Sequence, residues 1–307
     1  MSSPLVVSVP DQRLARAIQP LPEGVELHEW DLEGAPPAPH VDLVVAPYIG
    51  GTSVLERVAA VTPLLVQGQS IGVDGIADVL PAGVRFANAA TVHETATAEI
   101  ALALALGVLR DLPGSVRDQD RGEWNQHWAP GLADRHAVIL GAGGVGNAIA
   151  DRLTPFEVEV TRVARTARDD ERGRVHALSE LDSLLPGASL LVVALPLADG
   201  TRRLVDAGAL AALPDGAAVI NVGRGPVVDT DALVAELRSG RLLAGLDVTD
   251  PEPLPADHPL WSAPGTLITP HVGGLTRAML PRMAALVRRQ IDRLLAGDEP
   301  ENIVIGA

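Results

Sequence analysis

The chain has 307 residues, a formal net charge of −15, no cysteine and no lysine, and apolar residues make up 47% of it. Its length is enough for two domains with separate cores. Because the chain lacks cysteine and lysine, disulfide bonds, thiol catalysis, lysine Schiff-base catalysis and thiolate metal sites are excluded. No metal is expected. The negative charge argues against a nucleic-acid partner. The sequence has neither a membrane-length apolar run nor an N-terminal signal pattern, so we expect a cytoplasmic protein without membrane association.

Short apolar runs alternate with helical stretches in the first part of the chain. Strands are expected at residues 5–9, 41–46, 63–67 and 84–87. A helical piece is expected at residues 53–60, and a long apolar helix at residues 94–109, ending near Pro113. Strands that alternate with helices predict a parallel, doubly wound α/β sheet.

The rest of the chain repeats this rhythm. Strands are expected at residues 136–140, 157–163, 189–194, 217–222, 243–247 and 266–269. The stretches between them are predicted to be helical. A last helix, from about residue 277 to 295, is long enough to return to the first domain.

Glycines recur at the turn between the strand expected at residues 136–140 and a helix expected at 147–153. Gly141, Gly143 and Gly146 form the pattern G-x-G-x-x-G, which lets a dinucleotide pyrophosphate approach the N–H groups of a helix N-terminus. This motif, in this context, predicts a nicotinamide dinucleotide cofactor.

The glycine motif lies at mid-chain, and a strand–helix series precedes it. We therefore expect two Rossmann-like, doubly wound domains. One is discontinuous, residues 1–97 plus 284–307, and the other is a continuous dinucleotide-binding domain, residues 98–283.

The residue that reads the cofactor ribose is expected about 20 positions after the motif, at the end of the next strand. Position 164 is alanine, which cannot accept hydrogen bonds from a 2′-hydroxyl, and Arg165 and Arg168 follow. Because arginine can form a bidentate pair with a 2′-phosphate, the pattern favours NADP(H), with Arg165 as the main determinant. Alternatively Arg165 is a solvated loop residue, and NAD(H) remains possible. The acidic residues 169–171 fall past the expected strand end.

Four polar residues follow later predicted strands: Arg224, Asp247, Glu252 and His271. Open α/β sheets bind ligands at these carboxyl ends of strands. Reduction of a 2-keto acid needs a cation for the carboxylate and the keto oxygen, and a proton donor that titrates near neutrality. Arginine supplies the first, and histidine oriented by a carboxylate supplies the second. Each residue alone could be a surface or structural residue, but their combination favours a catalytic set.

Together these motifs resemble those of the D-isomer-specific 2-hydroxyacid dehydrogenases, over nearly the whole chain. The resemblance is carried by residues 69–74, 97–99, 141–146, 194–197 with Thr201, 221–225, 246–253 and 269–274. At Ala164 and Arg165 the chain departs from the common NAD-type members, which carry an acid there. At this point it is similar to the NADP-preferring glyoxylate and hydroxypyruvate reductase branch.

The resemblance implies roles for the polar residues. Arg224 would bind the substrate carboxylate and polarise the keto group. Glu252 would hydrogen-bond to His271, which would protonate the carbonyl oxygen as hydride arrives from the nicotinamide. The backbone N–H groups of Ile71 and Gly72 would hold the substrate carboxylate.

The resemblance also implies cofactor contacts and an assembly. Asp247 would bind the nicotinamide carboxamide, and Gly144 and Val145 the pyrophosphate. Four further residues would line the cofactor: Leu195, Pro196, Val222 and Gly223. The first domain would be a flavodoxin-like, substrate-binding domain, and the protein would be a homodimer whose contact uses about residues 98–135.

The expected reaction is the reduction of glyoxylate, hydroxypyruvate or a larger 2-keto acid to the D-2-hydroxy acid. Related phosphite enzymes have lysine in place of Ile71 and formate enzymes have glutamine in place of Glu252, so neither fits. A different class, the dinucleotide-sensing corepressor-like branch, can retain the Arg–Glu–His set. This chain lacks the obvious disordered flanks that such a partner-binding role would use. Four large aromatic residues are expected to fill a core, or else to line the substrate pocket: Tyr48, Trp124, Trp128 and Trp261.

Overall fold

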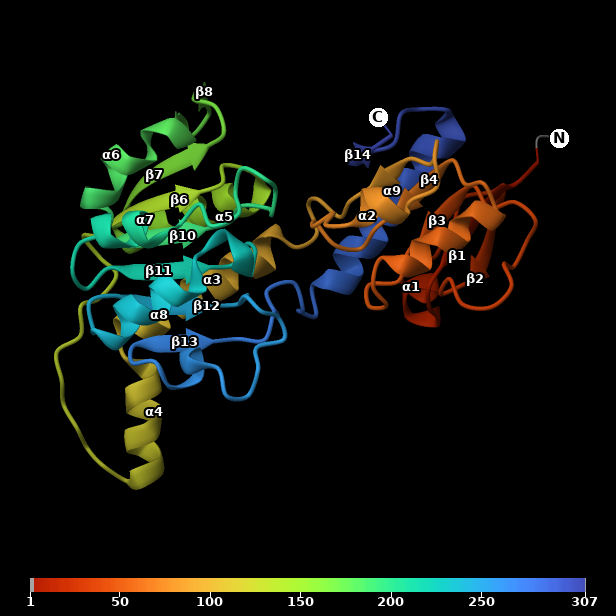
Figure 1. The fold of residues 1–307 in the computed structure, drawn as a ribbon. Helices are drawn as coiled ribbons and strands as arrows, with labels where there is room; N and C mark the ends of the chain where they lie inside the picture. Colours follow the sequence, from red (N-terminus) through yellow and green to blue (C-terminus); the bar gives the residue numbers. More distant parts are fainter. Residues whose placement is uncertain (1–2, 307) are drawn as a thin grey trace. The chain divides into compact units, whose positions relative to one another are not determined.

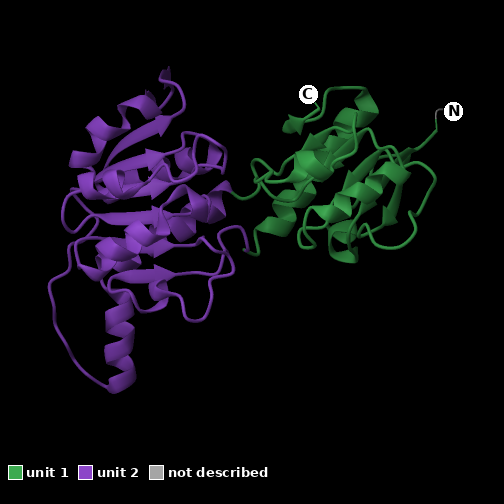
Figure 2. Cartoon of the chain, viewed as in Figure 1, with its two compact units in different colours: residues 1–93, 276–307 green, residues 94–275 purple. Residues whose placement is uncertain are grey.

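The computed structural model describes residues 3–306, and the chain forms two compact units (Figures 1 and 2). Unit 1 comprises residues 1–93 and 276–307, and unit 2 comprises residues 94–275. The boundaries expected after residues 97 and 283 fall inside helices α3 (Glu94–Leu109) and α9 (Met279–Ala296). The structure instead divides the chain before each of these helices begins.

Unit 1 is built on a six-stranded sheet with the order β14-β5-β4-β3-β1-β2. The strands are β1 (Leu5–Val9), β2 (Val25–Glu29), β3 (Leu43–Val45), β4 (Leu65–Gln67), β5 (Phe86–Ala87) and β14 (Ile303–Ile305). The first five are parallel, in the flavodoxin-like order, which confirms the doubly wound sheet. The sequence did not predict β2, which is only half-buried, or β14, which is antiparallel at the edge.

Helices α1 (Gln12–Ala17), α2 (Ile76–Val79) and α9 belong to unit 1, and α9 packs against α1. The expected helix at residues 53–60 is present as a 3₁₀ helix, η1 (Ser53–Ala60). One face of α9 is buried in the core of the sheet and carries Met283, Leu286, Val287 and Ile291. Apolar residues at this spacing form one stripe of a helix, so the last part of the chain completes the core of unit 1.

Unit 2 contains an eight-stranded sheet with the order β13-β12-β11-β10-β6-β7-β9-β8. The strands are β6 (His136–Leu140), β7 (Glu159–Ala164), β8 (Arg168–Asp170), β9 (Gly173–Ala177), β10 (Leu190–Val193), β11 (Ala218–Asn221), β12 (Leu243–Leu246) and β13 (Thr266–Ile268). All pairs are parallel except β8 with β9, a hairpin that the sequence did not predict. The order reverses between β6 and β10, which is where Rossmann sheets bind dinucleotides.

Helices cover both faces of the unit 2 sheet (Figure 1). They and the short 3₁₀ turns are α3, α4 (Leu112–Arg121), α5 (Gly144–Leu153), η2 (Thr154–Phe156), η3 (Leu178–Glu180), α6 (Leu181–Leu184), η4 (Leu185–Gly187), α7 (Ala207–Ala212), η5 (Gly225–Val227), α8 (Thr230–Arg238) and η6 (Pro259–Ser262). Successive side chains of a strand point to opposite faces. Ile139 therefore packs with α3 and α5, whereas Leu140 packs with α6, α7 and α8.

A further helix, α4, begins where the long helix was expected to end. The Asp111 side chain accepts a hydrogen bond from the Gly114 N–H and caps the helix, and Pro113 stands in the first turn. Proline is tolerated in the first helical turn because its missing N–H would have no helical partner there, so Pro113 does not stop the chain from being helical. No residue of α4 is buried. Among the helices within residues 3–306, none combines the length and the apolar character that crossing a membrane requires.

Candidate active site

The glycine motif forms the turn from β6 into α5. A Cβ atom on Gly146 would lie 1.6 Å from the carbonyl oxygen of Gly141, so only glycine lets the helix approach the strand this closely. Gly143 is different, because its φ is −96° and a Cβ there would meet no atom within 4 Å. Neither packing nor backbone conformation requires glycine at position 143, whereas a closely approaching pyrophosphate would. The first N–H groups of a helix have no helical acceptors, so those of Gly144 and Val145 fit an anion at this turn.

Two arginines follow the end of β7. Arg165 is exposed, and within residues 3–306 it makes no hydrogen bond or ion pair. Arg168 stands at the start of β8, and its Nη2 atom donates to the carbonyl oxygen of Ala142 at 2.9 Å. The structure thus places Arg168 against the glycine turn and leaves the Arg165 guanidinium in solvent.

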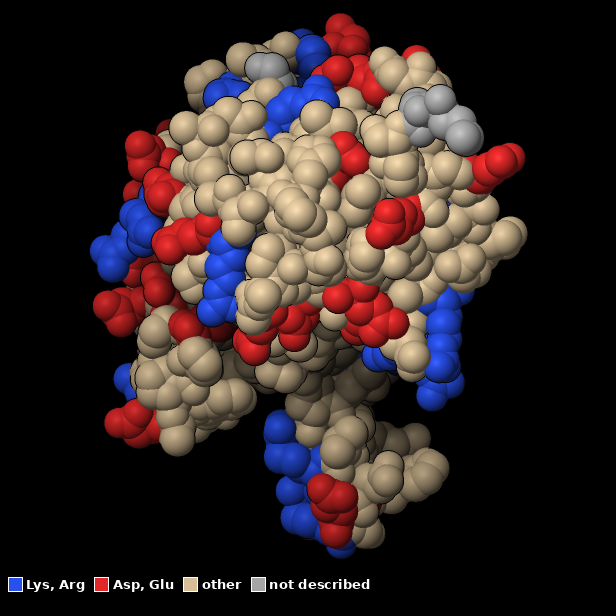
Figure 3. All heavy atoms as spheres, turned by 90° about the vertical axis from the view of Figure 1, so that its right-hand side faces the viewer, with Lys and Arg blue, Asp and Glu red and all other residues tan. Residues whose placement is uncertain are grey.

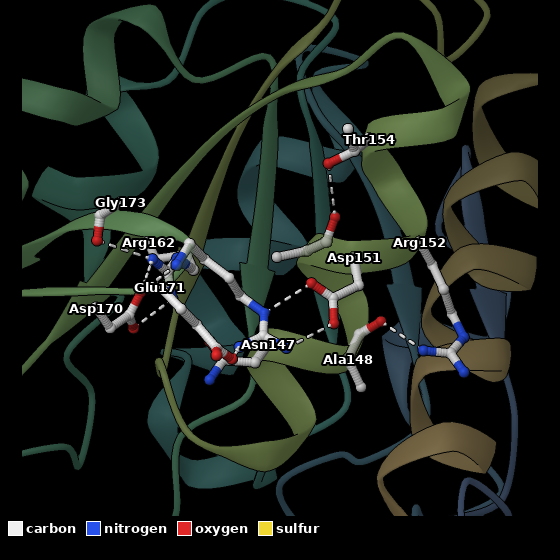
Figure 4. A network of polar contacts seen from close by, with 11 residues as sticks. Asn147, Ala148, Asp151, Arg152, Thr154, Arg162, Asp170, Glu171 and Gly173 are labelled. Carbon is white, nitrogen blue, oxygen red and sulfur yellow. Dashed lines mark hydrogen bonds and ion pairs between the residues drawn. The ribbon is translucent and has the colours of Figure 1, made fainter.

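A buried arginine fixes the β8–β9 hairpin beside α5 (Figure 4). The Arg162 side chain is only 4% exposed, and it donates to both carboxylate oxygens of Asp170 at 2.7 and 2.6 Å. It also donates to Asn147 Oδ1 on α5 at 3.0 Å and to the Gly173 carbonyl at 3.1 Å. The hydrogen bonds from Arg162 lower the pKa of Asp170 to about 2. Asp170 therefore stays ionised and paired across the neutral range.

A second ion pair joins the hairpin turn to α5. Arg172 donates to the two carboxylate oxygens of Asp151 at 2.7 and 3.0 Å. These hydrogen bonds lower the pKa of Asp151. Together the two pairs hold the hairpin, and with it Arg168, next to the glycine turn. This network was not predicted from the sequence, because residues 169–171 were expected to lie past the end of the strand.

The residues expected to line the cofactor lie together at the carboxyl edge of the sheet. Leu195 and Pro196 follow β10, and Val222 and Gly223 follow its parallel neighbour β11. A Cβ atom on Gly223 would lie 2.5 Å from the Leu195 carbonyl oxygen. These two loops are therefore in contact.

Arg224 lies in a turn that the side chain of Asn221 closes. Asn221 Oδ1 accepts from the Gly223 N–H at 3.1 Å, and its Nδ2 donates to the Arg224 carbonyl at 3.0 Å. A Cβ atom on Gly225 would lie 1.9 Å from the Thr249 carbonyl oxygen, so glycine brings this turn against the segment after β12. The half-buried Arg224 side chain donates from Nη1 to the Gly223 carbonyl at 2.7 Å.

Asp247 holds the loop that carries His271. Its side chain is buried, and Oδ1 accepts from Thr269 Oγ1 at 2.6 Å and from the Val272 N–H at 3.0 Å. Oδ2 accepts from the Gly273 N–H at 2.9 Å. A carboxylate has about four acceptor positions, so three of them serve this loop. The sequence did not predict this structural role.

His271 and Glu252 are in direct contact. His271 Nδ1 lies 2.6 Å from Glu252 Oε1, and the two side chains are 48% and 41% exposed. Because an ionised carboxylate only accepts hydrogen bonds, Nδ1 carries a hydrogen, and Nε2 is left to give or take a proton. His271 has a φ of +52°, a costly conformation for a non-glycine residue, and its N–H donates to the Asp247 carbonyl at 2.8 Å.

Ile71 and Gly72 belong to unit 1, in the loop between β4 and α2. Both are half-buried. The remaining expected site residues lie in unit 2, at the carboxyl edge of its sheet.

Comparison with known proteins identifies the family. Residues 102–273 match the family described as D-isomer specific 2-hydroxyacid dehydrogenase, NAD binding domain. The human glyoxylate reductase/hydroxypyruvate reductase is 32% identical over an alignment of 291 residues that covers 89% of this chain and 88% of the human protein.

Solved structures of 2-hydroxyacid dehydrogenases are similar to this chain. A D-isomer specific 2-hydroxyacid dehydrogenase from Xanthobacter autotrophicus, in complex with NADPH and MES, is 31% identical with a TM-score of 0.83, over 99% of each chain. An NADPH-dependent glyoxylate/hydroxypyruvate reductase from Sinorhizobium meliloti, in complex with NADP and sulfate, is 26% identical with a TM-score of 0.81, also over 99% of each chain. The chain therefore belongs to the D-isomer-specific 2-hydroxyacid dehydrogenases, a family of nicotinamide-dinucleotide-dependent oxidoreductases.

Proposed function

We propose that this chain reduces a 2-keto acid, such as glyoxylate, hydroxypyruvate or a larger analogue, to the D-2-hydroxy acid with NADPH. The observation that carries the proposal is the 2.6 Å contact between His271 Nδ1 and Glu252, in loops that follow strands of the sheet that bears the glycine turn. A histidine that is held at one nitrogen and open at the other suits proton donation. Relatives named as glyoxylate and hydroxypyruvate reductases support this substrate class.

The chemistry is divided among few groups. The bound cofactor supplies the hydride. His271 donates a proton from Nε2 to the carbonyl oxygen, and Glu252 orients the ring and stabilises its charged form. Arg224 pairs with the substrate carboxylate and stabilises negative charge on the keto oxygen, and the N–H groups of Ile71 and Gly72 bind the carboxylate.

The cofactor would be held mainly by backbone. The N–H groups of Gly144 and Val145 would bind the pyrophosphate, and Asp247 would accept a hydrogen bond from the nicotinamide carboxamide through its remaining acceptor position. The lining residues would be Leu195, Pro196, Val222 and Gly223. No metal takes part in this proposal.

The proposal is tested by incubating the purified protein with NADPH and a panel of 2-keto acids, and by following NADPH consumption. We expect turnover of at least one acid and a product of D configuration. Absence of turnover with every acid and both reduced cofactors would refute the proposal and favour the dinucleotide-sensing alternative.

The proposed preference for NADPH depends on Arg165. A charge-assisted hydrogen bond to phosphate is worth about 1.5–3 kcal/mol, so Arg165→Ala should raise the KM for NADPH by roughly ten- to a hundredfold. The KM for NADH should hardly change, because NADH has no 2′-phosphate. Steady-state kinetics with each cofactor measure both values.

Two further variants sharpen this test. Arg168→Ala shows how much the second arginine contributes to NADPH binding. Its guanidinium already donates a hydrogen bond to the Ala142 carbonyl. Arg238→Ala removes another exposed guanidinium at the C-terminal end of α8, the end farthest from the carboxyl edge of the sheet, and should leave both KM values unchanged. Equal use of NADPH and NADH by the unmodified protein would contradict the proposed preference.

We also propose that the protein is a homodimer whose contact includes the arm formed by α4 and the segment that follows it. Trp124 is 91% exposed and Trp128 is fully exposed, so the expectation that they fill a core is wrong. In Figure 3 the arm is the lowest part of the molecule, with basic side chains along one edge beside neutral and acidic ones. Large exposed aromatic residues are typical of interfaces, and a twofold dimer buries the same surface on both subunits.

The dimer proposal predicts a change of mass in solution. Trp124→Ser together with Trp128→Ser should convert a dimer to a monomer, because two aromatic anchors are lost from each side of the contact. Light scattering coupled to size-exclusion chromatography measures the mass. Phe156→Ser changes a 42% exposed aromatic residue elsewhere in unit 2 and should leave the dimer intact. An unmodified monomer, or a dimer that survives the double substitution, would count against the arm as the contact.

A further inference from the structure

The loop that contains Ile71 and Gly72 accepts hydrogen bonds from residues 88–93, to which the proposed function gives no role. Three consecutive backbone carbonyl groups of this loop accept hydrogen bonds from the segment after β5. The bonds are Gln69 O from His93 Nε2 at 2.6 Å, Ser70 O from the Ala89 N–H at 2.8 Å, and Ile71 O from Asn88 Nδ2 at 2.9 Å. One short segment, residues 88–93, therefore fixes the orientation of three successive peptide groups.

These bonds determine where the N–H groups point. The peptide bonds of this loop are trans, and in a trans peptide the C=O group and the next N–H point in opposite directions. The Ser70 carbonyl points to Ala89, so the Ile71 N–H points away from it. The Ile71 carbonyl points to Asn88, so the Gly72 N–H also points away. Within residues 3–306 neither N–H donates a hydrogen bond.

The side-chain amide of Asn88 can adopt only one orientation here. Its Oδ1 accepts from the Ala90 N–H at 3.1 Å, so Nδ2 must face the Ile71 carbonyl. The backbone of Asn88 is held as well, because its N–H donates to the Asn302 carbonyl at 3.1 Å and its carbonyl accepts from Gln67 Nε2 at 3.0 Å. Asn88 is only 9% exposed. A buried amide with all these partners holds the loop rigidly.

We propose that Asn88 is a positioning residue for the substrate, because it directs the N–H groups of Ile71 and Gly72 toward the substrate carboxylate. This inference rests on the proposed function, which assigns the two N–H groups to that carboxylate. Without the bond from Asn88, the peptide between Ile71 and Gly72 is free to rotate. Rotation turns the N–H away and presents a carbonyl oxygen, which repels an anion.

Asn88→Leu tests the inference, because leucine has a similar size but no polar atom. The KM for the 2-keto acid should rise by about ten- to a hundredfold, the effect expected for a lost hydrogen bond to a charged group. The inhibition constant of oxamate, an unreactive analogue with the same carboxylate, should rise by the same factor. The kcat should change by less than about threefold, because only uniform binding is lost, and the Kd for NADPH should stay the same.

Asn302→Gly is the matched control. Asn302 Nδ2 donates to the Ala90 carbonyl at 3.1 Å, so its loss removes one bond from the same segment but none from the loop. Asn302 has a φ of +59°, a conformation that glycine adopts without strain. This variant should keep the KM of the unmodified protein.

The possible outcomes are distinct. If Asn88→Leu does not fold, the smaller Asn88→Ser, which cannot reach the Ile71 carbonyl, should show the same rise in KM. An unchanged KM in either folded variant overturns the role of Asn88 while leaving the proposed function intact. A rise in the Kd for NADPH by the same factor would mark Asn88 as a general structural residue and would also overturn its proposed positioning role. If the unmodified protein reduces no 2-keto acid, the proposed function fails and this inference fails with it.

Discussion

Replacing His271 with alanine is expected to lower kcat for 2-keto acid reduction by about two to four orders of magnitude, the usual contribution of a positioned general acid. Its Nδ1 is held by Glu252 at 2.6 Å, so Nε2 is the atom that delivers the proton. The Kd for NADPH should be largely kept, because the glycine turn and the loops after β10 and β11 are unchanged. Steady-state kinetics and a binding titration give the two values.

A second histidine–glutamate pair in unit 2 provides the matched control. His176 Nδ1 lies 2.8 Å from Glu180 Oε2, and this pair has no place in the proposed chemistry. His176→Ala should therefore keep the kcat of the unmodified protein. A kcat that stays the same in His271→Ala would remove the acid–base assignment.

The substitution Glu252→Gln separates orientation from charge. Glutamine can still hydrogen-bond to His271 Nδ1, but it no longer stabilises the imidazolium. The kcat for reduction should therefore fall in Glu252→Gln, whereas the KM for the 2-keto acid and the Kd for NADPH should hardly change, because the ring keeps its position. Steady-state kinetics and a binding titration measure these values. A kcat that stays the same would show that Glu252 only orients the ring.

Arg224→Ala is expected to damage both substrate affinity and turnover. Loss of one donor to a developing oxyanion typically lowers kcat by about 10²–10³, and loss of the carboxylate partner should raise the KM about tenfold or more. Arg224→Lys restores the charge but not the planar fork, so it should recover only part of the activity. Kinetics over a range of 2-keto acid concentrations separate kcat from KM.

The control for Arg224 is Arg203→Ala. Arg203 is exposed and pairs with Asp229 at 3.6 Å, so its removal should leave both constants unchanged. If Arg224→Ala raises the KM but keeps kcat, the guanidinium binds the ground state and the transition state equally. The proposed stabilisation of charge on the keto oxygen would then be wrong.

Elements with buried, regular patterns could be predicted closely from the sequence. Strand β6 and helix α3 have the predicted bounds, because a continuous apolar run can be satisfied only in a core. The β8–β9 hairpin is polar and is held by Arg162 and Asp170, residues whose pairing depends on the fold around them. Helix α4 was not predicted for another reason: proline usually ends a helix, whereas Pro113 stands in the first turn, where proline is tolerated.

In the candidate site, too, some features could be predicted from the sequence and others depend on the folded structure. The contact of Glu252 with His271 was expected from family resemblance, and both residues follow strands of one parallel sheet. The three hydrogen bonds that Asp247 accepts could not be predicted, because they depend on the path of the loop at residues 269–273. The bond from Asn88 to Ile71 joins two loops, and no periodicity in the sequence marks it.

The placement of α9 has a consequence for synthesis on the ribosome. Unit 2 is one uninterrupted stretch, so it can fold as soon as residues 94–275 have emerged. Unit 1 cannot, because its core lacks Met283, Leu286, Val287 and Ile291 until α9 has been made. Domains generally fold in the order in which they are translated. Here unit 2 can fold before unit 1, and the apolar strands of unit 1 stay exposed to solvent until α9 has been synthesised.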